Sequence, residues 1–120
     1  MAIPSRVMGT GNSSQSTEAI CGKGAVGLVA TGTTIADAFL LTNENNTFTT
    51  SSASTGVRLL PTEVGAQIVI RNDSGVSLTI YPYSVASTIN AGATSLALAT
   101  AKTAVFFATS ATTWVSITTA

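Results

Sequence analysis

The chain has 120 residues, of which 45% are hydrophobic and only 8% are charged, and its formal net charge is zero. A chain of this length forms one domain with a packed core, and its charged fraction is about a third of the roughly 25% usual in soluble domains. The five basic residues are dispersed and five acidic residues offset them, which argues against a nucleic-acid partner, because phosphate recognition needs clustered Lys and Arg.

Residues 1–24 differ in character from the rest of the chain. They contain Pro4, the glycines Gly9, Gly11 and Gly22, and the polar run Gly11–Glu18, without a sustained period of 2 or 3.6 residues. We expect an extended N-terminal arm here, ahead of a β domain over residues 25–120. Such an arm either orders against a neighbouring subunit or stays frayed, and its residues leave both readings open. The arm residues that we expect to contact a partner are Ile3, Pro4, Arg6, Val7 and Met8.

From Gly24 onward, short β-type segments alternate with turn residues. The segment 34–41 fits either a strand or a single helical turn. Elsewhere, runs of β-branched, aromatic and alternating apolar residues predict strands over residues 26–30, 47–50, 57–60, 95–99, 103–109 and 113–117.

The clearest pattern is that of a β-hairpin over residues 66–81. Apolar residues alternate through both arms, 66–71 and 76–81. The linker Asn72–Gly75 suits a type I turn with Gly75 in the left-handed conformation. Pro82 then ends the second arm, because proline has no N–H to donate to a strand pairing.

Strands at this spacing, with turns between them, predict an all-β fold. The expected architecture is an antiparallel β-sandwich, jelly-roll-like or barrel-like, that carries the N-terminal arm. Its core is predicted from the largest apolar residues of the strands, and we expect core packing rather than ligand stacking from its aromatic side chains. The predicted core residues are Phe48, Ile68, Ile70, Leu78, Ile80, Phe106, Phe107 and Trp114.

The sequence offers little for catalysis. It has no histidine, so Ser/His/Asp and Cys/His nucleophile systems cannot form on this chain. Cys21 has neither a second sulfur nor an imidazole to complete a zinc site. The carboxylates occur singly, and only a pair brought together by folding is left open. We therefore expect no catalytic residue, no metal, no cofactor and no enzymatic activity, with a small lyase or hydrolase as the weaker alternative.

Residues Gly22–Gly27 match the pattern GxGxxG, which in dinucleotide-binding proteins joins a strand to a helix. Here a polar segment precedes it, and a β-branched stretch interrupted by Gly32 follows. That context predicts a flexible junction between arm and domain. The apolar runs are only a few residues long, and no secretion signal is visible, so neither a membrane partner nor secretion is expected.

The stretch from Leu28 to the C-terminus resembles a family of small structural proteins of tailed phages. It covers about three quarters of the chain. Residues 83–87 depart from the family pattern, which has a glycine-containing turn before Ile89. The segments that carry the resemblance are Ala30–Thr34, Ala36–Ala38, Thr55–Pro61, Gly65, Arg71–Asn72, Tyr81–Pro82, Ile89–Asn90 and Phe107–Trp114.

The resemblance implies a β-sandwich virion protein. In particular it implies a capsid cement (decoration) subunit, a homotrimer on the capsid exterior that binds the major capsid protein. The same pattern occurs in fibre- and tail-associated proteins, so the alternative is a binding module that contacts host glycans. Tyr81 and Tyr83, on either side of Pro82, are its candidate contacts, although a Tyr–Pro corner that closes the sandwich is the commoner explanation for such a pair.

Overall fold

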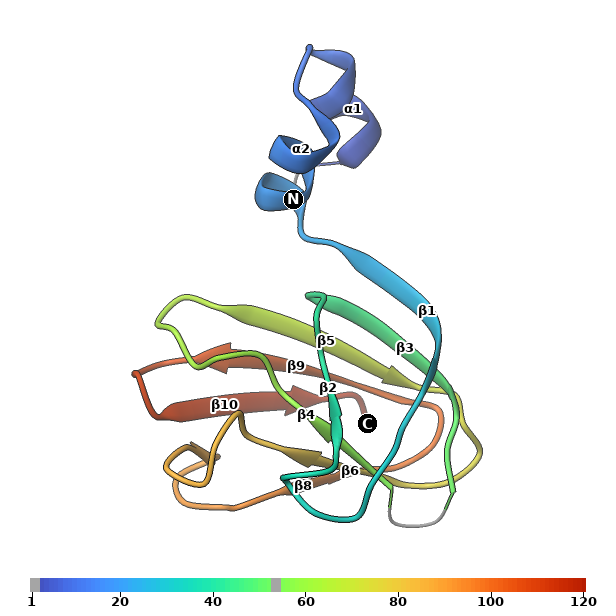
Figure 1. Cartoon of the computed structure of the whole chain (residues 1–120), viewed down its shortest axis with the longest axis vertical. Coiled ribbons are helices and arrows are strands. Elements are labelled where there is room, and N and C mark those ends of the chain that lie inside the picture. Colours follow the sequence, from blue (N-terminus) through green and yellow to red (C-terminus); the bar gives the residue numbers. More distant parts are fainter. Residues whose placement is uncertain (1–2, 53–54) are drawn as a thin grey trace.

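The computed structural model describes residues 3–52 and 55–120. Within these ranges, two short helices precede strands that form two sheets (Figure 1). Strands dominate, and helix is confined to the N-terminal segment, so the predicted all-β class is confirmed for the body of the protein. The helices are α1 (Pro4–Gly9) and α2 (Ser14–Cys21).

The strands divide between a six-stranded sheet, called sheet A, and a four-stranded sheet, called sheet B. In spatial order, sheet A consists of β1 (Gly24–Val29), β3 (Asn45–Thr50), β5 (Gln67–Asn72), β9 (Lys102–Ala108), β10 (Thr113–Thr118) and β7 (Thr88–Ile89). Sheet B consists of β2 (Phe39–Leu40), β4 (Gly56–Arg58), β6 (Leu78–Tyr81) and β8 (Leu96–Leu98).

The chain winds between the two sheets, and this winding overturns the antiparallel prediction. From β1 to β6 successive strands alternate between sheet A and sheet B, in the manner of a solenoid. Among the described residues, five of the eight strand pairings are parallel. Parallel neighbours need a crossover connection. In four of the five parallel pairings the crossover is a strand of the opposite sheet, and between β7 and β10 it contains β8 and β9. The antiparallel pairings are β5–β9, β9–β10 and β6–β8.

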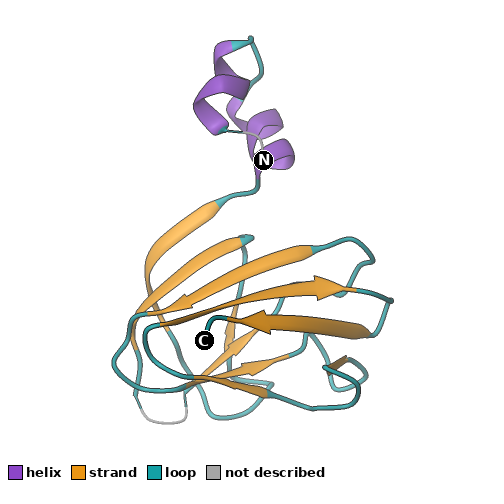
Figure 2. Cartoon of the chain, turned by 180° about the vertical axis from the view of Figure 1, so that it is seen from behind, coloured by secondary structure: helices purple, strands orange, loops and turns teal. Residues whose placement is uncertain are grey.

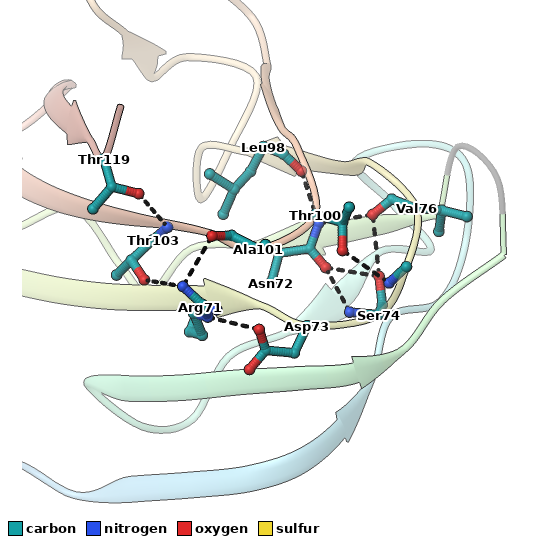
Figure 3. Close-up of polar contacts among 11 residues, drawn as sticks. Arg71, Asn72, Asp73, Ser74, Val76, Leu98, Thr100, Ala101, Thr103 and Thr119 are labelled. Carbon is teal, nitrogen blue, oxygen red and sulfur yellow. Dashed lines mark hydrogen bonds and ion pairs between the residues drawn. The ribbon is translucent and has the colours of Figure 1, made fainter.

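The predicted hairpin over residues 66–81 does not form. Its first arm is β5 in sheet A, and its second arm is β6 in sheet B. Asn72 lies fully buried where the chain changes sheets. Its side-chain amide donates to the carbonyl oxygens of Val76 and Leu98, both at 2.8 Å, and its Oδ1 accepts from the N–H and the hydroxyl of Ser74 (Figure 3). These hydrogen bonds hold the turn through which the chain passes from sheet A to sheet B.

The hydrophobic core lies between the two sheets. Phe48, Ile70 and Trp114 enter it from sheet A, while Leu78 and Ile80 enter it from sheet B, and all are fully buried. Ile68 and Phe106 lie in the same core. Phe107 does not: it is only half buried, so its prediction as a core residue is wrong. Successive side chains of a strand point to opposite faces, and with Phe106 inside, Phe107 lies outside.

The N-terminal arm is helical rather than extended in its described part. Pro4 occupies the first turn of α1, and Ser13 caps α2 by accepting a hydrogen bond from the Ser16 N–H at 3.1 Å. Helices of six and eight residues are too short to show a helical repeat of apolar residues. In the sequence, only Pro4 and Ser13 at their N-terminal ends distinguish them from coil. Residues 1 and 2 of the arm lie outside the described ranges. The division of the chain at residue 24 stays a prediction.

Candidate functional site

No group of three or more His, Cys, Asp or Glu residues that could hold a metal ion occurs within residues 3–52 and 55–120. Asp37 is the carboxylate whose pKa departs from its ordinary value. The hydroxyl and then the N–H of Thr34 donate to Asp37, and these bonds lower its pKa below 3.8.

The contacts of Asp37 explain the ambiguous segment 34–41. Asp37 Oδ1 accepts from the N–H groups of Thr33 and Thr34 at 3.1 and 2.7 Å, and from the Thr34 hydroxyl at 2.8 Å. Gly32 has a φ of +76°, and a Cβ there would lie 2.2 Å from the carbonyl oxygen of Asp37. The carboxylate therefore holds a tight turn ahead of β2, which is a structural role rather than a chemical one.

The predicted partner-contact residues gather on a single helix. Ile3 is the N-cap of α1, and Pro4, Arg6, Val7 and Met8 belong to the helix itself. Ile3 and Met8 expose about half of their surface, at 48% and 47%. None of the residues of α1 is buried. A helix of this length is not stable in water by itself. The apolar side chains of α1 lie at its surface and are not packed in a core.

The outer face of sheet A carries an apolar patch that sequence reasoning missed. In one row across the sheet, Phe107 of β9 pairs with Val115 of β10. In the next row, Val105 of β9 lies between Val69 of β5 and Ile117 of β10. Ile117 is 64% exposed. We call Val69, Val105, Phe107, Val115 and Ile117 the outer patch.

A sequence signal for the outer patch did exist. Strands with one buried face alternate apolar and polar residues, whereas residues 104–107 are apolar at every position. Phe106 fills the core and its neighbours Val105 and Phe107 lie on the opposite face. An uninterrupted apolar run in a strand that is not covered on both sides indicates an outward surface suited to contact with another protein.

The junction between arm and body is held by hydrogen bonds of Lys23. The N–H of Lys23 donates to Glu44 Oε2 at 2.8 Å. The carbonyl oxygen of Lys23 accepts from the N–H groups of Glu44 and Asn45 at 3.2 and 3.0 Å. The helices stand beyond the ends of the sheets and cross neither of them (Figures 1 and 2). The GxGxxG match, Gly22–Gly27, thus joins α2 to β1, and no helix follows it as dinucleotide binding requires.

A second surface surrounds the two tyrosines considered for glycan contact. The Tyr81 hydroxyl donates to the carbonyl oxygen of Thr33 at 2.9 Å. The guanidinium carbon of Arg58 lies 5.5 Å from the centre of the Tyr83 ring, a cation–π distance. A cavity of about 320 Å³ opens beside Tyr81 and does not include Tyr83. Its lining residues are Thr33, Thr34, Ile35, Tyr81, Pro82, Val85, Ser87 and Thr94.

Within the described ranges, no helix is long and apolar enough to cross a membrane. Comparisons with protein-family models, with curated proteins and with solved structures found no match to this chain.

Proposed function

We propose that this protein is a structural component of a tailed-phage virion, a cement subunit on the outer surface of the capsid. The observation that carries the proposal is the projecting arm. It presents Ile3 and Met8 to solvent, and α1 buries none of its residues. Apolar side chains that are exposed, outside the core of their own chain, are typical of proteins that work in an assembly.

The remaining features agree with a role in assembly. A cement protein bridges subunits of a shell and needs neither a cofactor nor a reactive group. Stable protein–protein interfaces bury about 800 Å² per partner. The arm and the outer patch together offer two separate contact surfaces on a chain with few charges. The proposed partners are the major capsid protein and further copies of this chain, as a homotrimer.

We also propose that the two sheets act as the layers of a β-sandwich. The packed core between them supports this, since a close-packed interior has low compressibility and transmits strain. The predominantly parallel winding distinguishes it from the antiparallel sandwich expected at first.

The test is the copy number of this protein relative to the major capsid protein in purified virions, measured by quantitative mass spectrometry. A ratio near one, or near a simple fraction of one, is expected of a subunit that covers the capsid lattice. A handful of copies per particle contradicts the cement role and moves the protein to the tail, neck or fibre.

The alternative is a fibre- or tail-associated module that binds host glycans. The cavity beside Tyr81 favours it, because threonine and serine residues line that cavity together with the tyrosine. Binding to a glycan array that is lost in Tyr81→Ala, while the variant stays folded, would support this function. Tyr83→Ala serves as the comparison, since Tyr83 does not line the cavity.

A further inference from the structure

Copies of this chain have two matching surfaces, one on the arm and one on the body. On the arm, α1 presents Ile3 and Met8 and carries one charged residue, Arg6, which is exposed and has no ion-pair partner among the described residues. On the body, the outer patch is uncharged; Val115 and Ile117 are exposed, at 39% and 64%, and its other residues are partly buried. We propose that α1 of one copy docks on the outer patch of a neighbouring copy.

The dimensions of the two surfaces agree. The outer patch spans three adjacent strands, β5, β9 and β10, which at about 4.8 Å per strand is roughly 10 Å wide. A helix with its side chains is about 10 Å across, and six helical residues extend about 9 Å. The patch therefore fits one helix of the length of α1.

The charges agree as well. Glu63 is exposed and has no ion-pair partner within the described part of the chain. Glu63 lies at one border of the outer patch. Two residues further along the same turn, Gly65 donates its N–H to the carbonyl oxygen of Ala108, and Ala108 follows Phe107 on β9. Docking of α1 brings Arg6 next to Glu63, so that each gains an ion-pair partner. No charged residue then lies among the apolar contacts.

The occupant is a second copy because the arm projects away from the patch of its own chain. Hydrogen bonds between Lys23 and the turn at Glu44 and Asn45 hold the end of the arm against the body. The arm leaves from β1, at one edge of sheet A, and the nearest strand of the outer patch, β5, lies two strands away, about 10 Å at ordinary strand spacing. In both views of the molecule the helices point away from the sheets (Figures 1 and 2).

Such a contact joins two different surfaces and is repeated from copy to copy. Head-to-tail contacts of this kind close into a ring when the rotation between copies divides a full turn. Three copies close at a rotation of 120°, which is the homotrimer of the proposed function, and the inference rests on that function for the number of copies.

Charge reversal in the full-length protein tests the pairing. We expect Arg6→Glu and Glu63→Arg each to weaken self-association by about fivefold, measured by sedimentation velocity over a concentration series. The double variant Arg6→Glu/Glu63→Arg restores the opposite charges and should return to within twofold of the wild type. Two single variants that associate like the wild type, or a double variant without recovery, would overturn the pairing.

Substitution of the patch tests the surface itself. Ile117→Asp places a charge among the apolar contacts and is expected to leave a monomer, with circular dichroism and melting temperature reporting that the body is folded. Val85→Asp is the matched control, because Val85 is 86% exposed and lies outside the patch, and this variant should associate like the wild type. An Ile117→Asp oligomer of wild-type affinity contradicts the inference.

Cross-linking identifies the occupant. Met8→Cys and Val115→Cys are prepared as separate full-length chains, each with Cys21→Ser, and then mixed and oxidised. A disulfide-linked pair of the two different chains supports docking between copies. A disulfide that forms only when both cysteines are on one chain means that the arm covers its own body, which refutes the proposal. A monomer that still reaches a high copy number on capsids also refutes it, while the cement role stands.

Discussion

The side-chain amide of Asn72, on sheet A, donates to the carbonyl oxygen of Leu98, on sheet B, across 2.8 Å. The same amide donates to Val76 and its oxygen accepts two bonds from Ser74, so all four hydrogen-bonding positions of the Asn72 side chain are used. One buried residue thus joins the two sheets at the point where the chain passes between them. A buried polar group with every partner in place makes this corner specific.

Asn72→Ala is expected to lower the free energy of unfolding by about 3 kcal/mol, because it leaves the carbonyl groups of Val76 and Leu98 without their donor. Chemical denaturation followed by tryptophan fluorescence measures the change. Asn45→Ala is the control, since Asn45 is exposed on the outer face of β3, and it should change stability by less than about 0.5 kcal/mol. Equal effects of the two substitutions would show that the corner contributes nothing particular.

Trp114 and Thr62 form a second buried contact, in which the indole N–H donates to the threonine hydroxyl at 3.0 Å. Thr62→Val leaves the indole donor unpaired and should cost about 1–3 kcal/mol, whereas Trp114→Ala, which also empties the core, should cost about 3–5 kcal/mol. In a Trp114→Phe background, Thr62→Val should cost much less, because the donor is already absent. A double-mutant cycle from thermal denaturation measures the coupling, and additive effects contradict it.

Gly56 lies beneath the ring of Tyr81. A Cβ at Gly56 would lie 2.7 Å from Cε2 of Tyr81 and 3.3 Å from Cβ of Ala38. Gly56→Ala should therefore displace the tyrosine and cost about 1–3 kcal/mol. Gly24→Ala is the matched control, since nothing lies within 4 Å of its Cβ position. The melting temperatures compare the two variants, and a drop in Gly24→Ala as large as that in Gly56→Ala would exclude steric conflict as the cause.

The Asp37 turn predicts a pH dependence of stability. The Thr34 hydroxyl and the N–H groups of Thr34 and Thr33 favour the charged carboxylate and lower its pKa below 3.8 in the folded protein. The unfolded chain therefore binds a proton more readily than the folded one. Stability from Asp37 is complete above pH 3.8 and is lost as the pH falls through the lower folded pKa.

Asp37→Asn removes this titration, so the melting temperature of the variant should fall less than that of the wild type between pH 5 and pH 2.5. If the melting temperatures of the wild type and of Asp37→Asn fall in parallel with pH, the assignment of this pH dependence to Asp37 is contradicted.

Removal of residues 2–20 deletes α1 and nearly all of α2. The hydrophobic core begins at Ala30, so the truncated chain should fold and its free energy of unfolding should change by less than about 1 kcal/mol. Occupancy on capsids, measured by the same mass spectrometry as the copy number, is expected to fall. Unchanged occupancy would show that the arm has no part in attachment.

The composition and the alternation of residues determined the all-β class, because side chains of a strand face opposite sides whatever the strand pairs with. They also placed Ile68, Ile70, Leu78 and Ile80 correctly, since each lies at an inward position of its strand. The wrong prediction of Phe107 as a core residue is explained by the same alternation. Two adjacent aromatic residues cannot both point inward from one strand.

Only the tertiary structure decided which strands are neighbours. Alternation in residues 66–71 and 76–81 is the same whether the two segments pair within one sheet or face each other from opposite sheets. The buried amide of Asn72 and its bond to Leu98 select the second arrangement. The contact surfaces follow from it, because the outer patch exists only when β5, β9 and β10 lie side by side. Its residues are as far apart in the sequence as Val69 and Ile117, so no local pattern could have joined them.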